Sequence, residues 1–438
     1  MKKVDINFLE RRRKVFNLVQ DNSLVIIHSS NLVARNADAN YPFRQNSDFF
    51  YLTGFDEPES CLVLKKVSGV EEFILFCRDR DPLREQWDGL RSGQEGAKKD
   101  FGADDAYSIQ DLDKILPNTL EGIRTIYYPM VNSNGIDISL NKWLEITRLN
   151  ARSGSEAPQT IIALESILHE IRLIKSSEEV EVMKIAASIT AEAHCNAMKK
   201  VTPGMFEYQL EAEYLQTFMK HGSRAAAYNS IVGGGNNACI LHYNENKDEL
   251  KNGDLVLIDA GCEYQNYASD VTRTFPVGGK FTEAQKSIYE VVLNAHSEAL
   301  KQLIPGNPWI KVHEASVNAI TKGLIDLGIL DGVMEDLIEQ EKFSRFYMHR
   351  VGHWLGMDVH DVGNYKVDGE WRALEAGMVL TIEPGIYILD SLEGVDAKWL
   401  GIGIRIEDDV LITKDGFEIL TSEVPREIEA IEALMHGS

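Results

Sequence analysis

The chain has 438 residues, of which 44% are hydrophobic and 26% charged, and its formal net charge is −23. These values are typical of a globular protein that is long enough for two domains, each with a substantial core. The acidic balance argues against nucleic-acid binding, which needs clustered Lys and Arg. No run approaches the roughly 18 apolar residues of a membrane span, and MKKVDINFLERRRK lacks the apolar region of a signal peptide, so we expect a cytoplasmic protein that does not bind membranes.

The first third of the chain reads as alternating short helices and strands. The basic run Arg11–Arg13, in FLERRRKVF, is expected to form the solvated face of an N-terminal helix. Apolar runs of strand length follow at 23–30, 61–67 and 71–79, and a Gly-Val pair between the last two indicates a hairpin turn. Five cysteines without a CxxC spacing favour neither a disulfide framework nor a thiolate zinc site, so we expect reduced core residues.

A change of composition marks a domain boundary. The segment LNARSGSEAPQT, residues 149–160, is rich in small and polar residues. After HEIRLIKS, Ser176 and Glu179 have the spacing of a capping box at the start of a helix. We therefore expect an N-terminal α/β domain over residues 1–172 and a second domain over residues 173–438.

The second domain contains an internal repeat. AHCNAMKKVTPG (193–204) and AHSEALKQLIPG (295–306) share six of twelve residues, and each precedes another helical pattern. Chance similarity between helices built from common residues is the alternative. A real repeat predicts two similar αα-plus-β halves, and a cleft between such halves is a natural place for a ligand.

Two acids interrupt apolar runs in VLIDAGCEYQNYASDVTRTF, residues 256–275. If a hairpin is centred between Tyr264 and Gln265, Asp259 and Asp270 face each other across it, with Cβ atoms about 4.5–5.5 Å apart and their like charges in repulsion. A solvated sheet edge is one interpretation. The other is a buried pair neutralised by a divalent cation, for which oxygen ligands suit manganese, magnesium or cobalt.

The C-terminal half supplies further candidate ligands. Glu383 ends an apolar strand in MVLTIEPGIYI, and Glu407 lies inside another in GIGIRIEDDVLIT, with Arg405 on the same face. An edge glutamate paired with Arg405 is the alternative for Glu407. The segment MHRVGHWLGMDVHDVG carries three histidines, and three near two buried glutamates favour ligands and acid–base groups over ordinary core residues. These histidines are His349, His353 and His360.

The number of acids indicates the number of metal ions. Two divalent cations neutralise the four carboxylates, with His353 as a neutral fifth ligand. Such a pair can share bridging carboxylates, hold a water that becomes hydroxide near neutral pH, and stabilise the oxyanion of a polarised carbonyl. The predicted chemistry is hydrolysis of an amide.

Four motifs together resemble the dinuclear metallopeptidases of the pita-bread fold, the group of methionine aminopeptidase, prolidase and aminopeptidase P: IDAGCEYQNYASDVTRTF, HRVGHWLGMDVHDVG, TIEPGIYI and GIGIRIEDDV. RNADANYPFRQNSDFFYLTGFDEPES and ILHYNEN resemble the bacterial Xaa-Pro aminopeptidases (aminopeptidase P) in particular. The resemblance implies an RNase-H-like, creatinase-type α/β domain before an α+β pita-bread domain with an internal pseudo-twofold repeat. It also implies release of the N-terminal residue from peptides with proline in second position, by a metal-bridging hydroxide.

The resemblance assigns roles residue by residue. Glu383 would also accept the proton of the bridging water, His242 and His360 would bind the scissile carbonyl and the substrate, and His349 and Arg405 would line or support the proline pocket. The two divalent ions would be Mn²⁺, with Co²⁺ or Zn²⁺ as alternatives. Their implied ligands are Asp259, Asp270, His353, Glu383 and Glu407.

Three further roles fall in the N-terminal domain. Asp38 and Arg152 match proton-shuttle partners of the family, and Trp87 in REQWDG matches a residue that reaches the site of a neighbouring subunit. The resemblance thus implies a homo-oligomer, either a tetramer or a dimer.

Three alternative functions stay open. Prolidase, which is restricted to Xaa-Pro dipeptides, shares the metal motifs. Methionine aminopeptidase would not need the first 170 or so residues. The fold also serves as a non-catalytic binding module, but such relatives lack the ligands, whereas all five positions are filled here.

Overall fold

The computed structural model describes residues 4–131 and 136–437. The described residues form two compact units: those within 6–171 form the N-terminal domain, and residues 4–5 with 172–437 form the C-terminal domain. The division falls between Ile171 and Arg172. No helix of the described residues is long and apolar enough to cross a membrane.

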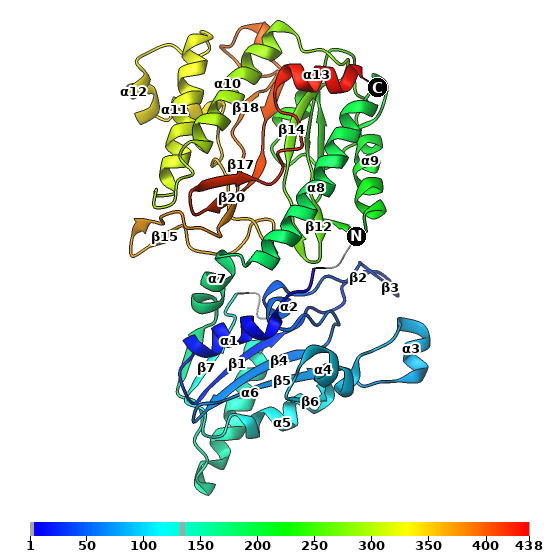
Figure 1. The fold of residues 1–438 in the computed structure, drawn as a ribbon, viewed down its shortest axis with the longest axis vertical. Coiled ribbons are helices and arrows are strands. Elements are labelled where there is room, and N and C mark those ends of the chain that lie inside the picture. Colours follow the sequence, from blue (N-terminus) through cyan, green and yellow to red (C-terminus); the bar gives the residue numbers. More distant parts are fainter. Residues whose placement is uncertain (1–3, 132–135, 438) are drawn as a thin grey trace. The chain divides into compact units, whose positions relative to one another are not determined.

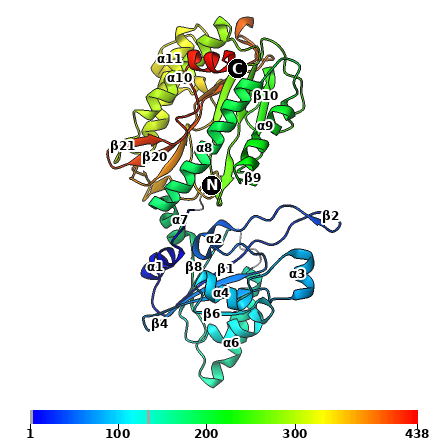
Figure 2. The same cartoon turned by 45° about the vertical axis from the view of Figure 1, so that its right-hand side comes forward.

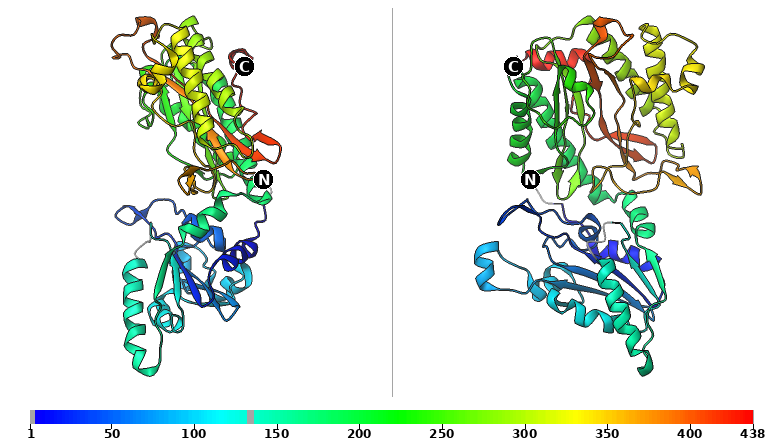
Figure 3. Two further views of the ribbon diagram at one scale, coloured as in Figure 1. Left: turned by 90° about the vertical axis from the view of Figure 1, so that its left-hand side faces the viewer. Right: turned by 180° about the vertical axis from the view of Figure 1, so that it is seen from behind.

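The N-terminal domain is built on a six-stranded sheet of order β6-β5-β4-β1-β7-β8 (Figure 1). Strand β1 pairs antiparallel with β4 and parallel with β7, so the sheet is mixed. Helices α5 and α6 pack Leu116 and Trp143 into a core cluster on one face of the sheet, and α1 lies on the other face (Figure 3, left). The elements are α1 (Phe8–Leu18), β1 (Ser23–His28), β2 (Ala34–Asn36), β3 (Ala39–Asn40), α2 (Ser47–Thr53), β4 (Cys61–Val67), β5 (Val70–Cys77), α3 (Pro82–Asp88), α4 (Gly93–Phe101), β6 (Asp105–Ser108), α5 (Leu112–Thr119), β7 (Thr125–Tyr128), α6 (Ile136–Leu149), β8 (Thr160–Ala163) and α7 (Glu165–Leu173).

The basic run in α1 is not a solvated face. Arg11 and Arg12 are each only 4% exposed. Arg12 donates from Nη1 to the carbonyl of Leu52 at 2.9 Å, and its guanidinium lies 4.2 Å from the ring centroid of Phe73. The helix is confirmed, but its predicted solvation is wrong for these two residues, because guanidinium groups pack on aromatic rings and donate to free carbonyls.

In the C-terminal domain, the helix pairs α8–α9 and α10–α11 lie on opposite sides of the central strands (Figures 1, 2 and 3). The strands form several short sheets, among them β10-β11-β14 and β17-β20-β21. The elements are α8 (Ser177–Lys200), α9 (Glu207–Lys220), β9 (Ala225–Ala226), β10 (Ile231–Gly234), β11 (Leu255–Asp259), β12 (Cys262–Tyr264), β13 (Tyr267–Ala268), β14 (Thr272–Pro276), α10 (Glu283–Leu300), α11 (Ile310–Asp326), α12 (Met334–Glu339), β15 (Lys366–Val367), β16 (Glu370–Trp371), β17 (Val379–Ile382), β18 (Gly385–Ile388), β19 (Ile402–Arg405), β20 (Asp408–Thr413), β21 (Gly416–Ile419) and α13 (Ile428–His436).

The start of α8 is as the sequence predicts. Ser176 is its N-cap, and the side chains of Ser176 and Glu179 form the reciprocal hydrogen bonds of a capping box. These bonds satisfy two backbone N–H groups that have no partner inside the helix. The local sequence is therefore sufficient to start this helix.

The internal repeat is present in three dimensions. Each Pro-Gly turn has a glycine with positive φ, +88° at Gly204 and +92° at Gly306. Gly204 donates to the carbonyl of Leu250 at 2.8 Å, and Gly306 donates to that of Leu374 at the same distance. Both acceptors precede a central strand, β11 in one half and β17 in the other. The two halves therefore connect the turn of their helix pair to the segment before one central strand, β11 or β17, in the same way.

The hairpin that carries the two aspartates has a different register from the predicted one. Its turn is Gln265–Asn266, both with positive φ, and Tyr264 pairs with Tyr267. Asp259 consequently faces Thr272. The expected pairing of Asp259 with Asp270 is wrong, because a two-residue turn of this type needs two left-handed residues and leaves Tyr264 in its strand.

Gly261 is required by close packing inside this hairpin. A Cβ at this position would lie 1.7 Å from the carbonyl oxygen of Ser269. We expect Gly261→Ala to lower the free energy of unfolding by more than about 3 kcal/mol, as measured by thermal or urea unfolding.

Gly253→Ala is the matched control, because Gly253 has φ +92° but an added Cβ would meet no heavy atom within 4 Å. We expect the free energy of unfolding of this variant to fall only by the backbone strain, about 1–2 kcal/mol. Equal losses of unfolding free energy in the two variants would contradict the close approach of Gly261 to the Ser269 carbonyl.

Candidate active site

A cavity of about 800 Å³ lies in the C-terminal domain. It is lined by every residue of this domain to which the sequence analysis assigned a role, together with aromatic and apolar side chains. The assigned residues are His242, Asp259, Asp270, His349, His353, His360, Glu383, Arg405 and Glu407, with Glu383 serving in two of the assigned roles.

Strand ends place the acids around this cavity. Asp259 is the last residue of β11, Asp270 lies just before β14, and Glu383 directly follows β17. Glu407 lies between β19 and β20 rather than inside a strand as predicted. At such positions the backbone leaves the regular ladder, and the side chain can turn toward the cavity instead of alternating across a sheet.

Asp259 and Asp270 approach each other at one hydroxyl group. The Tyr228 hydroxyl lies 2.6 Å from Oδ1 of Asp259 and also contacts Oδ1 of Asp270. One hydroxyl carries a single proton, so it can donate to only one carboxylate at a time. The two acids are therefore close neighbours, although they are not cross-strand partners.

Three side chains form a potential metal-binding group. One ligand atom each from Asp270, His353 and Glu407 lies within 4.8 Å of the other two. His353 contacts the Trp354 carbonyl through Nδ1 at 3.0 Å. Its Nε2 faces the acids, 3.4 Å from Oδ2 of Asp270 and 3.6 Å from Oε1 of Glu383.

The pKa shifts show that negative charge is crowded here. Burial, followed by the charge of Asp270, raises the pKa of Glu407 well above its ordinary value. Burial raises the pKa of Glu383 to about 7, although His353 and Arg405 act in the opposite direction. Burial disfavours a charged His353, but Asp270 and Glu383 prevail and raise its pKa to about 9. The positive charges of His353 and Arg405 therefore do not offset the effects of burial and repulsion on Glu383 and Glu407.

A chain of polar contacts leads from Asp259 to His349. Arg405 donates from Nη2 to Asp259 at 2.6 Å and from Nη1 to the Tyr387 hydroxyl at 2.9 Å. That hydroxyl lies 2.9 Å from Nε2 of His349, whose Nδ1 contacts the Arg350 carbonyl at 2.8 Å. A carbonyl only accepts, so Nδ1 is the donor nitrogen and Nε2 accepts from Tyr387. Burial lowers the pKa of His349 to about 3, so the ring is neutral.

His242 and His360 line the cavity without being buried. The His360 ring centroid lies 4.3 Å from that of His353, and the two rings are inclined at 73°. Partial desolvation of the ring and the charge of the neighbouring His353 lower the pKa of His360. Both histidines are thus accessible to a molecule that enters the cavity.

The three assigned residues of the N-terminal domain lie outside this cavity. Asp38 lies in the turn between β2 and β3, and Arg152 follows α6, both with exposed side chains. Trp87 lies in α3 and is 86% exposed. Their proposed roles remain predictions.

Sequence reasoning missed several residues of the cavity wall. Tyr387 follows Glu383 at even spacing along TIEPGIYI, and this spacing could have placed both on one face. Tyr228 lies between three alanines and Asn229-Ser230, in a segment without a clear strand or helix pattern, so no signal indicated it. Other missed residues that line the cavity are Ile231, Leu241, Trp309, Arg350, Tyr365 and Trp371.

Comparison with known proteins agrees with the fold and the site. A model of metallopeptidase family M24 matches residues 181–414, and a model of the aminopeptidase P N-terminal domain matches residues 8–127. The Xaa-Pro aminopeptidase of Haemophilus influenzae is 47% identical over 430 residues, which cover 98% of this chain and 97% of that protein. Two solved structures are similar over 99% of both chains: aminopeptidase PepP of Pseudomonas aeruginosa, with 50% identity and a TM-score of 0.97, and zinc-substituted Escherichia coli aminopeptidase P in complex with product, with 46% identity and a TM-score of 0.96.

The fold and the site together define a two-domain metallopeptidase with a pita-bread catalytic domain. The chain belongs to metallopeptidase family M24 and carries the N-terminal domain of aminopeptidase P. Both predictions that rest on the resemblance, the family and the fold class, are confirmed.

The donor set fits divalent metal ions. The cavity brings together carboxylate oxygens and one imidazole nitrogen, which suit ions such as manganese and zinc. Burial and mutual repulsion raise the pKa of Glu407 and Glu383, and positive charge placed between these carboxylates would relieve both effects.

Replacement of one of these carboxylates should weaken metal binding without lowering the stability of the metal-free protein. Glu407 is 2% exposed, and its Oε2 accepts a hydrogen bond from Thr272 at 2.6 Å. We expect the metal-free Glu407→Gln variant to melt at or above the temperature of the metal-free wild type, because burial of an ionisable carboxyl group beside other acids no longer opposes folding. Wild-type protein should gain about 2.7 kcal/mol at Mn²⁺ a hundredfold above Kd, and the variant should lose most of this gain.

Glu418→Gln is the control, since Glu418 forms a surface ion pair with Lys184. Melting curves with and without Mn²⁺ provide the measurement for all three proteins. An undiminished Mn²⁺-induced shift in Glu407→Gln would show that Glu407 does not hold the ion.

Proposed function

We propose that this protein is a dinuclear-metal aminopeptidase that hydrolyses the N-terminal Xaa-Pro bond of peptides. The observation that carries the proposal is the convergence of four carboxylates and His353 on one cavity. It is supported by similarity to Xaa-Pro aminopeptidases over 98% of the chain. Whole-length similarity includes the N-terminal domain and therefore favours aminopeptidase P over methionine aminopeptidase.

The proposed metal ligands are the four acids near strand ends and one histidine from a loop: Asp259, Asp270, Glu383 and Glu407, with His353. A pair of divalent ions held there would supply Lewis-acid chemistry. We propose Mn²⁺ as the physiological ion, because the set is dominated by hard carboxylate oxygens. A zinc-substituted form of the Escherichia coli relative has been solved, so Zn²⁺ and Co²⁺ stay as alternatives.

The other polar side chains of the cavity bind, orient and move protons. Glu383, with a pKa raised to about 7, is suited to take the proton of the attacking water. His242 and His360 are accessible donors for the scissile carbonyl and the substrate backbone. Arg405 fixes Asp259 and, through Tyr387, the ring of His349.

A dedicated enzyme for this bond has a physical reason. The Xaa-Pro bond is a tertiary amide without an N–H group, and proline fixes φ, so peptidases that dock substrates as a strand lose a contact. Rigid rings line one part of the cavity: Trp309, Tyr365 and Trp371. An apolar wall of this kind suits a pyrrolidine ring and can use its rigidity for selection.

Prolidase is the alternative that shares the metal centre, and substrate length separates the two activities. We expect the Mn²⁺-loaded protein to cleave an Xaa-Pro-Xaa tripeptide with a higher kcat/KM than the Xaa-Pro dipeptide, and to require a free N-terminal amine. In the same assay His242→Ala and His360→Ala should lower kcat roughly 10²–10³-fold while bound Mn²⁺ stays unchanged.

Two outcomes would redirect the proposal. A clear preference for the dipeptide would favour prolidase. Loss of Mn²⁺ from either histidine variant would mean that a ligand has been mistaken for a substrate-binding group. Two substrates that share their Xaa-Pro sequence decide the first outcome, and metal analysis of the histidine variants decides the second.

Helix α3 favours self-association. It has no buried residues, and it exposes three large apolar side chains within it or just beyond its end, Leu83, Trp87 and Leu90, at 75%, 86% and 83%. Exposed apolar groups clustered in this way mark interaction sites. We propose a homo-oligomer, a tetramer or a dimer, in which Trp87 closes the site of a neighbouring subunit, with Asp38 and Arg152 as proton-shuttle partners.

Trp87→Ala should reduce the assembly or its activity without affecting the metals. We expect a lower mass by light scattering, or weaker turnover of tripeptides at unchanged Mn²⁺ content. Val70→Ala is the control, because Val70 is 69% exposed on another part of the same domain. A fully active monomeric wild type would contradict the proposed role of Trp87.

The cytoplasmic location expected from the sequence also remains a prediction.

A further inference from the structure

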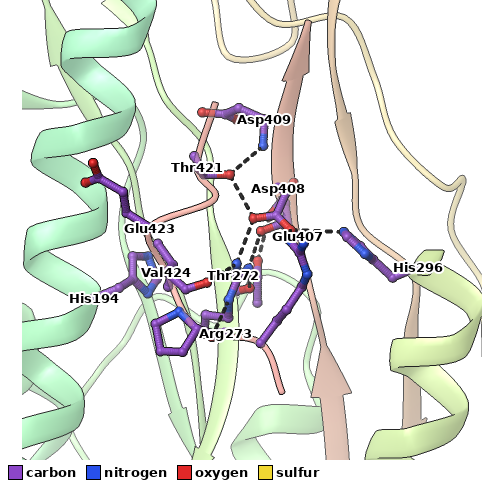
Figure 4. A network of polar contacts seen from close by, with 12 residues as sticks. His194, Thr272, Arg273, His296, Glu407, Asp408, Asp409, Thr421, Glu423 and Val424 are labelled. Carbon is purple, nitrogen blue, oxygen red and sulfur yellow. Dashed lines mark hydrogen bonds and ion pairs between the residues drawn. The ribbon is translucent and has the colours of Figure 1, made fainter. Parts of the chain in front are cut away.

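The two halves of the repeat carry a histidine at the same place. His194 in α8 and His296 in α10 occupy the second position of AHCNAMKKVTPG and AHSEALKQLIPG. Both side chains are fully buried. Neither lines the cavity of the proposed active site. Figure 4 shows them entering one region from helices on opposite sides of the strands.

His194 has a fully determined set of partners. Its Nε2 lies 3.1 Å from the carbonyl oxygen of Ala260, and its Nδ1 lies 2.8 Å from the Tyr214 hydroxyl. The carbonyl can only accept, so Nε2 carries the proton and Nδ1 accepts from Tyr214. Burial lowers the pKa of His194 to about 3, which keeps this tautomer neutral.

The acceptor of His194 is next to a proposed metal ligand. Ala260 directly follows Asp259, and its N–H donates to the carbonyl of Val271 at 3.0 Å. Val271 in turn directly follows Asp270. One hydrogen bond from α8 therefore fixes the pair of backbone positions that follow the two aspartates.

His296 has the corresponding place in the other half. Its Nε2 lies 3.2 Å from Oδ2 of Asp408, an ion-pair contact without the alignment of a hydrogen bond, and Asp408 directly follows Glu407. Burial lowers the pKa of His296, although the contact with Asp408 and its charge act in the opposite direction. Both histidines thus contact, through Nε2, the residue that follows a proposed ligand.

Arg273 connects the side chain of Asp408 to the main chain of Glu407, as Figure 4 shows. Oδ1 of Asp408 accepts from Nη2 of Arg273 at 2.7 Å, and the same guanidinium donates from Nη1 to the carbonyl of Glu407. The Glu407 N–H donates to the Thr272 carbonyl at 3.0 Å. Burial opposes ionisation of Asp408, but Arg273, His296 and Arg426 prevail and lower its pKa. The backbone of Glu407 is therefore held on both sides.

We infer that His194 and His296 are equivalent positioning residues of the metal centre, each fixing through Nε2 the chain segment that carries a ligand from its own half of the repeat. This inference rests on the proposed function, because it takes Asp259, Asp270 and Glu407 as ligands. Residues behind a ligand typically change metal affinity 10–100-fold when mutated. A histidine with a purely structural role would change stability and leave metal affinity unchanged.

The test compares two amides that differ by one methylene group. A glutamine amide can place a donor near the position of Nε2, whereas an asparagine amide is too short to reach it. We expect His194→Asn and His296→Asn to raise the Kd for Mn²⁺ about tenfold or more, and the two Gln variants to stay within about threefold of wild type. Calorimetric titration of metal-stripped full-length protein with Mn²⁺ gives the Kd, and melting in the absence of metal gives the stability.

Two controls account for general destabilisation. Met183→Ala in α8 and Ile288→Ala in α10 remove buried volume at least two helical turns from the histidines. They should lower the melting temperature and leave Kd unchanged. Asn variants that melt earlier but bind Mn²⁺ with wild-type Kd would overturn the inference.

The Gln variants decide the question if the Asn variants do not fold. A folded Gln variant that binds Mn²⁺ tenfold more weakly than wild type would show that the Nε2 contact is not what matters. Asp270→Asn separates this inference from the proposed function. If that variant keeps all its Mn²⁺, the ligand assignment fails; if it loses Mn²⁺ while the Asn variants bind normally, only the role of the histidines is rejected.

Discussion

The crowding of four carboxylates around one cavity, three of them buried and one half-buried, is the constraint on which the rest of this structure depends. Asp259, Asp270, Glu383 and Glu407 are drawn from separate segments, and Arg405 and His353 contact them as positive or protonatable partners. Uncompensated burial of a single charge already costs several kcal/mol. Interactions elsewhere in the fold must offset the free-energy cost of burying these carboxylates, and bound cations would offset part of it.

The internal repeat of the C-terminal domain holds these carboxylates in place. Two helix pairs flank the central strands, and in each half the glycine of a Pro-Gly turn donates to a carbonyl shortly before a central strand, β11 or β17. Asp259 and Glu383 end or follow these two equivalent strands. The repeat thus delivers acids to one seam from both sides, and the cavity lies where they meet. The same architecture explains why the equivalent helices each bring a buried histidine to the strands.

Behind the cavity, the charges are compensated in a different way. Arg273 and Asp408 are both fully buried and paired at 2.7 Å, and Arg273 also donates to the main-chain carbonyls of Glu407, next to Asp408, and of Val424 in another segment. A buried ion pair of this kind contributes little net stability compared with apolar packing, because desolvation opposes the attraction. Its geometric effect is more important here, since a guanidinium with five donors can hold several chain segments in one arrangement.

Much of this protein was determined by local sequence. The capping box at Ser176 and Glu179 starts α8, the repeat of residues 193–204 and 295–306 predicts two similar halves, and acids in apolar runs identify the strands that carry the proposed ligands. Each of these signals depends on neighbours within a few residues or on a pattern that recurs along the chain. For that reason, they could be recognised from the sequence alone.

Tertiary structure decided what depends on contacts between distant segments. The register of the aspartate hairpin follows from which two residues adopt positive φ, and Tyr264 gives no local sign of this. Arg11 and Arg12 resemble a solvated basic run until α2 and β5 supply carbonyls and a ring. Tyr228 and Tyr387 enter the site only because the fold brings their hydroxyl groups to Asp259, Arg405 and His349. Hydrogen bonds and burial are properties of pairs in space, and a sequence pattern encodes only one member of each pair.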